Sequence, residues 1–121
     1  MSWHKEGSNG FWGPCAQWNH YLKKYVVFMN QAIDEGWKMR GVCVTFNDDI
    51  GNPDGWSIPQ KILDRGECMF DPKKPDSGYY VTVMGTSPGK TDKLTGKTAR
   101  LFLMGRSRWE VVFLKPGEER P

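Results

Sequence analysis

The chain has 121 residues, with 17 basic and 14 acidic side chains that leave a net charge of +3. This length fits one domain of ordinary size, so we expect a single domain over residues 1–121. Aromatic residues make up 13% of the chain, which together with the small net charge excludes an intrinsically disordered protein. No stretch reaches the roughly 18 apolar residues of a membrane-spanning helix, and we expect no membrane partner.

The first third of the sequence has the spacing of a helix. Residues 1–13 are rich in glycine and aromatic residues, and we expect an irregular aromatic arm there. Pro14 suits the first turn of a helix, and Gly36 would close one. Between them, apolar residues return every three or four positions, which predicts one buried helix face: Trp18, Leu22, Val26, Met29 and Ile33. We therefore expect a long N-terminal helix over residues 14–35.

Beyond Gly36 the apolar residues alternate with polar ones, which is typical of strands. A short strand at residues 56–63 would lie at a sheet edge, because Pro59 cannot donate a ladder hydrogen bond. A tight hairpin at Gly105–Arg108 joins the last two strands, and residues 115–121 should form a frayed tail. The clearest strands cover residues 41–46, 79–84, 99–104 and 109–114.

These elements predict the α+β fold class. The long N-terminal helix would pack on a mainly antiparallel sheet of four to six strands, since sequential strands with short links pair antiparallel and a helix must cover one face. The sequence leaves the strand order open.

The link from Gly85 to Lys97 is the segment most suggestive of binding. It contains Gly-Lys-Thr twice, but its glycine spacing and the strand that follows exclude a nucleoside-triphosphatase phosphate loop. Links of this length are uncommon between paired strands, so we expect a loop that is mobile in the free protein and ordered by a polyanion. Basic side chains in and after it would contact phosphates: Lys90, Lys93, Lys97, Arg100, Arg106 and Arg108.

An aromatic residue completes the predicted ligand-binding set. Tyr79 and Tyr80 are neighbours on an expected strand, so their side chains should lie on opposite faces of the sheet. We expect one in the core and Tyr80 on the surface, where it could stack on a base.

The spacing of the cysteines and histidines predicts neither disulfides nor a metal site. Cys15, Cys43 and Cys68 are odd in number and far apart, which predicts buried, reduced thiols rather than disulfides. The start of the chain lacks the apolar run of a secretory signal, so we expect a cytoplasmic location. No Cys-x-x-Cys or His-x₃-His pair predicts a metal site, and no cofactor is expected.

Two hypotheses for function stay nearly level. The first is a non-enzymatic binding module for an anionic ligand, either nucleic acid or a nucleotide, which acts through the basic hairpin loop and strand. The second is a small inhibitor or adaptor, encoded by a virus or mobile element, that binds a host protein with its many Trp and Tyr residues. A small enzyme is a third alternative, although no motif places a nucleophile beside a base. The oligomeric state stays open.

Overall fold

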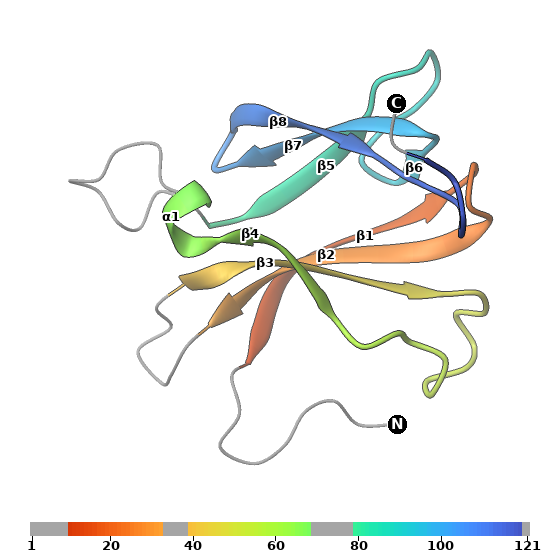
Figure 1. Cartoon of the computed structure of the whole chain (residues 1–121), viewed down its shortest axis with the longest axis horizontal. Helices are drawn as coiled ribbons and strands as arrows, with labels where there is room; N and C mark the ends of the chain where they lie inside the picture. Colours follow the sequence, from red (N-terminus) through yellow and green to blue (C-terminus); the bar gives the residue numbers. More distant parts are fainter. Residues whose placement is uncertain (1–9, 33–38, 69–78, 120–121) are drawn as a thin grey trace.

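The computed structural model describes residues 10–32, 39–68 and 79–119. These ranges hold eight strands and one short helix (Figure 1), in this order along the chain: β1 (Phe11–Asn19), β2 (Lys24–Ala32), β3 (Met39–Asn47), β4 (Gln60–Asp64), α1 (Arg65–Cys68), β5 (Val81–Gly85), β6 (Leu94–Thr95), β7 (Thr98–Leu103) and β8 (Arg106–Val112). Within them, no helix has the length and apolar character needed to cross a membrane.

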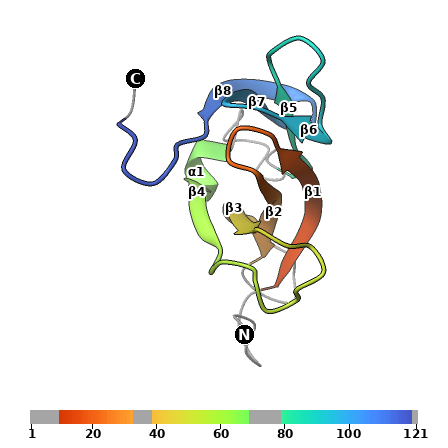
Figure 2. The same cartoon turned by 90° about the vertical axis from the view of Figure 1, so that its right-hand side faces the viewer.

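The strands form two sheets that pack face to face. A curled sheet has the strand order β4-β3-β2-β1-β6, and a smaller sheet has the order β5-β7-β8. Neighbours pair antiparallel except β6, which runs parallel to β1. Figure 2 shows the smaller sheet lying across the hollow side of the curled one. The two edge strands β4 and β8 therefore lie on the same side of the molecule.

The predicted helix over residues 14–35 is wrong, and with it the α+β fold class. Strands β1 and β2 form an antiparallel hairpin there, turned at His20–Lys23, where Lys23 has a positive φ of 56°. Residues 11–13 of the expected arm belong to β1. Residues 1–9, Ile33 and Gly36 lie outside the described ranges.

The helical spacing of the apolar residues in this segment is accidental. Trp18 lies in β1, Leu22 in the turn and Val26 in β2, and Trp18 pairs with Tyr25 whereas Val26 pairs with Gln17, so Trp18 and Val26 lie on opposite faces of the sheet. The alternation of β1 was hidden because two of its buried positions, Gln17 and Asn19, are polar. Of the predicted architecture, only the mainly antiparallel pairing of the strands is confirmed.

The strand predictions in the rest of the chain are confirmed. The segments expected at residues 41–46, 79–84, 99–104 and 109–114 correspond to β3, β5, β7 and β8. The strand expected at residues 56–63 begins only at Gln60, after Pro59, and this strand, β4, lies at a sheet edge as expected. The β7–β8 turn is shorter than predicted, because Met104 and Gly105 both have positive φ (51° and 79°) and close a two-residue hairpin.

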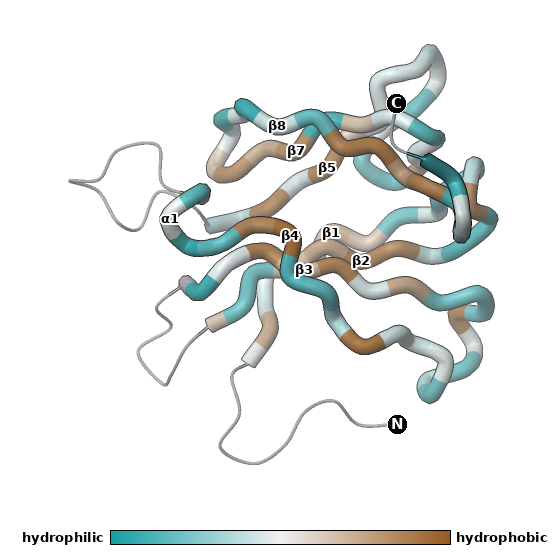
Figure 3. Tube along the Cα trace, in the orientation of Figure 1, coloured by the Kyte–Doolittle hydropathy of each residue, from teal (hydrophilic) through white to brown (hydrophobic). Residues whose placement is uncertain are grey.

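The hydrophobic core lies between the two sheets. Figure 3 shows hydrophobic stretches in strands of both layers. The fully enclosed members are Val26, Phe28 and Val42 from the curled sheet and Val83, Leu101 and Leu103 from the smaller one. All three cysteines are buried and free, as predicted. Burial raises the pKa of the Cys68 thiol to about 12, which leaves it unreactive at neutral pH.

We predict that Phe28→Ala destabilises the protein strongly. Phe28 is 1% exposed, and its ring lies 6.1 Å from that of Phe113, edge to face. The free energy of unfolding, measured by urea denaturation, should fall by about 3–5 kcal/mol because apolar burial is lost and a cavity remains. The control Ile58→Ala changes a side chain that is 69% exposed and should cost less than about 0.5 kcal/mol. Equal effects would contradict this core.

Candidate functional site

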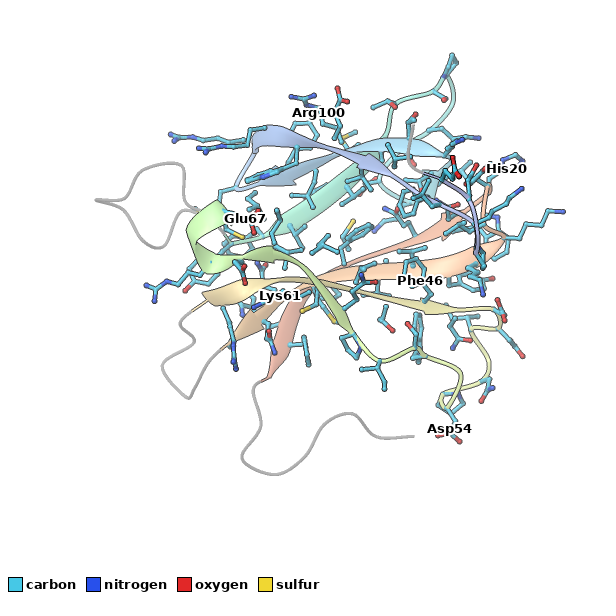
Figure 4. All side chains as sticks on the ribbon, in the orientation of Figure 1. His20, Phe46, Asp54, Lys61, Glu67 and Arg100 are labelled. Carbon is cyan, nitrogen blue, oxygen red and sulfur yellow. The ribbon has the colours of Figure 1, made fainter. Side chains whose placement is uncertain are left out.

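The six predicted basic residues do not converge on one site. Lys97 and Arg106 lie at opposite ends of β7, about 20 Å apart at the usual rise of a strand. Arg100 lies between them and points away from the curled sheet (Figure 4). A single small anion therefore could not contact the whole set.

Several of these cations already have partners. Lys97 pairs with Glu118 at 3.1 Å, and Arg100 pairs with Glu110 at 3.7 Å. The Arg108 guanidinium lies 5.8 Å from the centre of the Trp109 ring. The two carboxylates offset part of the positive charge that the surface of β7 and β8 presents to a ligand.

The remaining predicted residues differ in exposure. The Lys93 side chain is 74% exposed and lies 3.9 Å from the Asp92 carboxylate. Lys90 is half-buried, with its first side-chain carbons against Gly85, and Arg106 is exposed at the start of β8. Tyr80 is 62% exposed and its ring lies edge-on to Trp12 at 5.5 Å. It lies before β5, with a positive φ of 60°, and not on the expected strand.

The link from Gly85 to Lys97 is not the unanchored loop that its length suggested. The Trp18 amide donates to the Lys93 carbonyl at 3.0 Å, and the His20 amide donates to that of Thr95 at 2.8 Å. These bonds make Leu94–Thr95 the outer strand β6 of the curled sheet. An anchored backbone does not need a polyanion to order it.

The tail that we predicted to be frayed is attached to the rest of the protein at Lys115 and Glu118. The Tyr21 hydroxyl donates to Glu118 Oε2 at 2.6 Å, and the Lys115 amide donates to Oε1 at 3.0 Å. The Lys115 ammonium lies over the Tyr21 ring, 4.4 Å from its centre. This clamp attaches the chain after β8 to the β1–β2 turn and fixes where Phe113 and Leu114 lie.

An opening lies between the edge strands β4 and β8, and we call it the β4–β8 cleft. It consists of two adjoining hollows of about 410 Å³ each, which share Gln60, Ile62, Val111 and Val112 as lining residues. Trp109 lines one hollow, and Phe113 and Leu114 line the other. Ile62 is 36% exposed, so the cleft presents an apolar side chain to solvent.

Local backbone features place Ile62 in the cleft. The register of β4 against β3 shifts between Lys61 and Leu63, so Ile62 is the extra residue of a bulge, which re-aims a side chain. Gly41 of β3 permits this approach, because a Cβ there would collide with the carbonyl oxygen of Leu63. Lys61 and Asp64 on the same strand form an ion pair at 2.5 Å.

The backbone of β8 faces the cleft with hydrogen-bonding groups. Phe113 donates its amide to the Lys97 carbonyl on the β7 side, and β7 pairs with β8 in constant register from Thr98 to Leu101. Because amides alternate in direction along a strand, those of Glu110 and Val112 point away from β7. We call the outer side of residues 110–112 the free edge, since it pairs with no described strand.

No group of three His, Cys, Asp or Glu side chains among the described residues could hold a metal ion. No known protein family, curated protein or solved structure matches this chain.

Sequence reasoning missed the cleft, although part of its signal was present. Pro59 correctly indicated an edge strand, and the last strand of the chain was identified as alternating. Two edges form an opening only when they lie on the same side of a sandwich, which depends on the strand order. The bulge at Ile62 has no clear signature in a run such as Gln60–Asp64.

We predict that the tail clamp weakens in acid. Hydrogen bonds from Tyr21, the Lys115 amide and Lys97 lower the pKa of Glu118 from 4.5 to about 2. A pKa that is lower in the folded state stabilises the fold fully above pH 4.5, and this stabilisation is lost as the pH falls towards 2. Glu118→Gln should therefore melt below the wild type at pH 6 and together with it near pH 2. A melting-temperature difference that does not change with pH would contradict the clamp.

Proposed function

We propose that this chain is a protein-binding module that takes an extended segment of a partner polypeptide into the β4–β8 cleft. The observation that carries the proposal is the free edge of β8 beside an apolar lining that includes the exposed Ile62 and the half-buried Val111. Peptides that add a strand to a sheet gain affinity from main-chain hydrogen bonds and specificity from pockets for alternate side chains. Among the hypotheses drawn from the sequence, this agrees best with an adaptor or inhibitor.

The charges beside the cleft define the chemistry of its ligand. Lys61 pairs with Asp64 on the β4 side, and Glu110 pairs with Arg100 on the β8 side. The cleft therefore has cations and anions in equal number at these positions. An occupant needs apolar residues at alternate positions, which face Ile62 and Val111, rather than a strong net charge.

We predict that a random octapeptide library displayed on phage and selected on the wild-type protein yields alternating apolar sequences. Synthetic versions should bind about tenfold more weakly to Ile62→Lys, because the lysine places a charge in the apolar part of the cleft lining. The matched control Ile50→Lys changes an exposed apolar residue outside the cleft and should leave affinity unchanged. Isothermal titration gives the affinities, and thermal melts confirm that both variants fold. Equal affinity for Ile62→Lys would exclude the cleft.

A second candidate function is the binding of an anionic ligand, and the exposure of Lys93 favours it. The hollow on the outer face of the smaller sheet is lined by Thr86, Thr98 and the Arg100–Glu110 pair. It holds one cation with its counter-ion, so a nucleotide is supported less well than a nucleic-acid backbone. Lys90, Lys93 and Lys97 would supply the phosphate contacts.

This second candidate predicts a salt-dependent affinity for oligonucleotides. The logarithm of the binding constant should fall with that of salt concentration, with a slope of about −0.7 to −0.9 for each phosphate neutralised. Changing Lys90, Lys93 and Lys97 together to Ala should reduce the slope by about two to three. Titrations with single- and double-stranded oligonucleotides measure it. Absence of binding at low salt would eliminate this candidate and leave the cleft proposal intact.

A further inference from the structure

We infer that the Glu118 carboxylate of the tail clamp occupies an anion-binding site of this chain, and that a phosphate monoester binds there by displacing it. The site is formed by Tyr21 of the β1–β2 turn, Lys97 before β7 and Lys115 after β8. None of these three residues lines the β4–β8 cleft, so the inference goes beyond the function proposed above.

Donors from three separate segments converge on this one carboxylate. The Tyr21 hydroxyl donates to Glu118 Oε2 at 2.6 Å, and the Lys97 ammonium donates to the same oxygen at 3.1 Å. The Lys115 amide donates to Oε1 at 3.0 Å, so both oxygens accept hydrogen bonds. The Lys115 ammonium lies 4.4 Å from the centre of the Tyr21 ring and adds a second cation. The fold therefore builds an anion site, which the chain's own side chain fills.

A tight turn in the tail presents Glu118 to the site. The sequence Lys115-Pro116-Gly117-Glu118 has proline and glycine at the second and third positions, as a type II turn prefers. Gly117 has the positive φ of 81° that this turn requires, and the Glu118 amide donates to the Lys115 carbonyl at 2.9 Å. Because backbone atoms close the turn, it does not require the Glu118 side chain. The Lys115 amide therefore stays available when another anion replaces the carboxylate.

The charge balance of the site favours an anion with more charge than a carboxylate. Lys97 and Lys115 place two ammonium groups at 5.3 and 4.4 Å from the centre of the Tyr21 ring, whereas Glu118 supplies one negative charge. A phosphate monoester carries about −1.5 to −2 charges at neutral pH and has three strongly accepting oxygens. Its charge would balance both lysines. Its three oxygens would take one each of the donors that the two oxygens of Glu118 now share.

Tethering of Glu118 selects phosphate over a carboxylate from another molecule. Glu118 competes as an intramolecular group, and short linkers give effective concentrations of about millimolar. An external carboxylate makes the same contacts without this advantage, so Glu118 excludes it at lower concentrations. A phosphate monoester differs by its additional charge and its third oxygen, which strengthen the hydrogen bonds from the lysines. The tail therefore acts as a competitor that admits only the stronger anion.

The site is open to a ligand from solvent. The side chain of Lys97 is 44% exposed and that of Glu118 is 25% exposed, and Lys115 is exposed. Figure 1 shows the tail after β8 at the same end of the molecule as the β1–β2 turn. An anion can therefore reach the lysines while Glu118 is still bound, and its exchange with Glu118 does not require the core to open.

The test compares the binding of inorganic phosphate by the full-length wild type and by Glu118→Ala. Removing the tethered competitor should lower the dissociation constant about tenfold or more, because the site is then open in every molecule instead of a small fraction. The matched control Glu119→Ala removes the same charge from the exposed neighbouring residue and should leave affinity unchanged. Isothermal titration measures both, at a temperature where thermal melts show each variant folded. No gain for Glu118→Ala, or an equal gain for Glu119→Ala, would overturn the site.

Two further titrations test the donors and the class of anion. Adding Tyr21→Phe to Glu118→Ala should raise the dissociation constant for phosphate about tenfold, because a hydrogen bond to a charged group is lost. An unchanged constant would show that phosphate binds elsewhere. Acetate, the carboxylate probe, should bind the wild type more weakly than phosphate does. Equal affinities would overturn the selection of phosphate.

A measurement on the wild type tests the inference without any substitution. Phosphate titrated into isotopically labelled protein should shift the nuclear magnetic resonance signal of the Lys115 amide in a saturable way, because that amide exchanges one acceptor for another. No shift at phosphate concentrations well above the effective concentration of Glu118 would overturn the site. A phosphoserine peptide that saturates the same signal at lower concentration than inorganic phosphate would identify a phosphorylated protein as the ligand, and equal concentrations would identify the free ion.

Discussion

Buried polar contacts between β1 and the segment around β6 determine the shape of this molecule. Gln17 donates to the Val83 carbonyl at 3.0 Å and accepts from the Thr95 hydroxyl at 2.8 Å, while Asn19 donates to the Gly96 carbonyl at 2.9 Å. Leaving such a buried group without its partner costs about 1–3 kcal/mol. This network closes the two sheets on one side. The opposite side, where β4 and β8 end their sheets, has no comparable connection among the described residues, and the cleft lies there.

The second half of the fold could be predicted because its alternation is undisguised. Val81 and Val83 are buried on β5, as are Leu101 and Leu103 on β7, each with a more exposed residue between. The β1–β2 hairpin could not, since a buried asparagine or glutamine is counted as solvent-exposed in any hydrophobicity pattern. Asn19 is fully buried because Thr95 and Gly96 satisfy its amide, and those partners lie more than 70 residues away.

The candidate site was harder to predict than the fold for a related reason. A cluster of basic residues indicates a binding surface only when its counter-ions are elsewhere, and here they arrive from distant positions. Glu118 reaches Lys97 because the tail folds back onto Tyr21. Arg100 meets Glu110 through the register of the β7–β8 pair. Neither contact follows from local spacing, so charge along the sequence overstated the charge available to an anion.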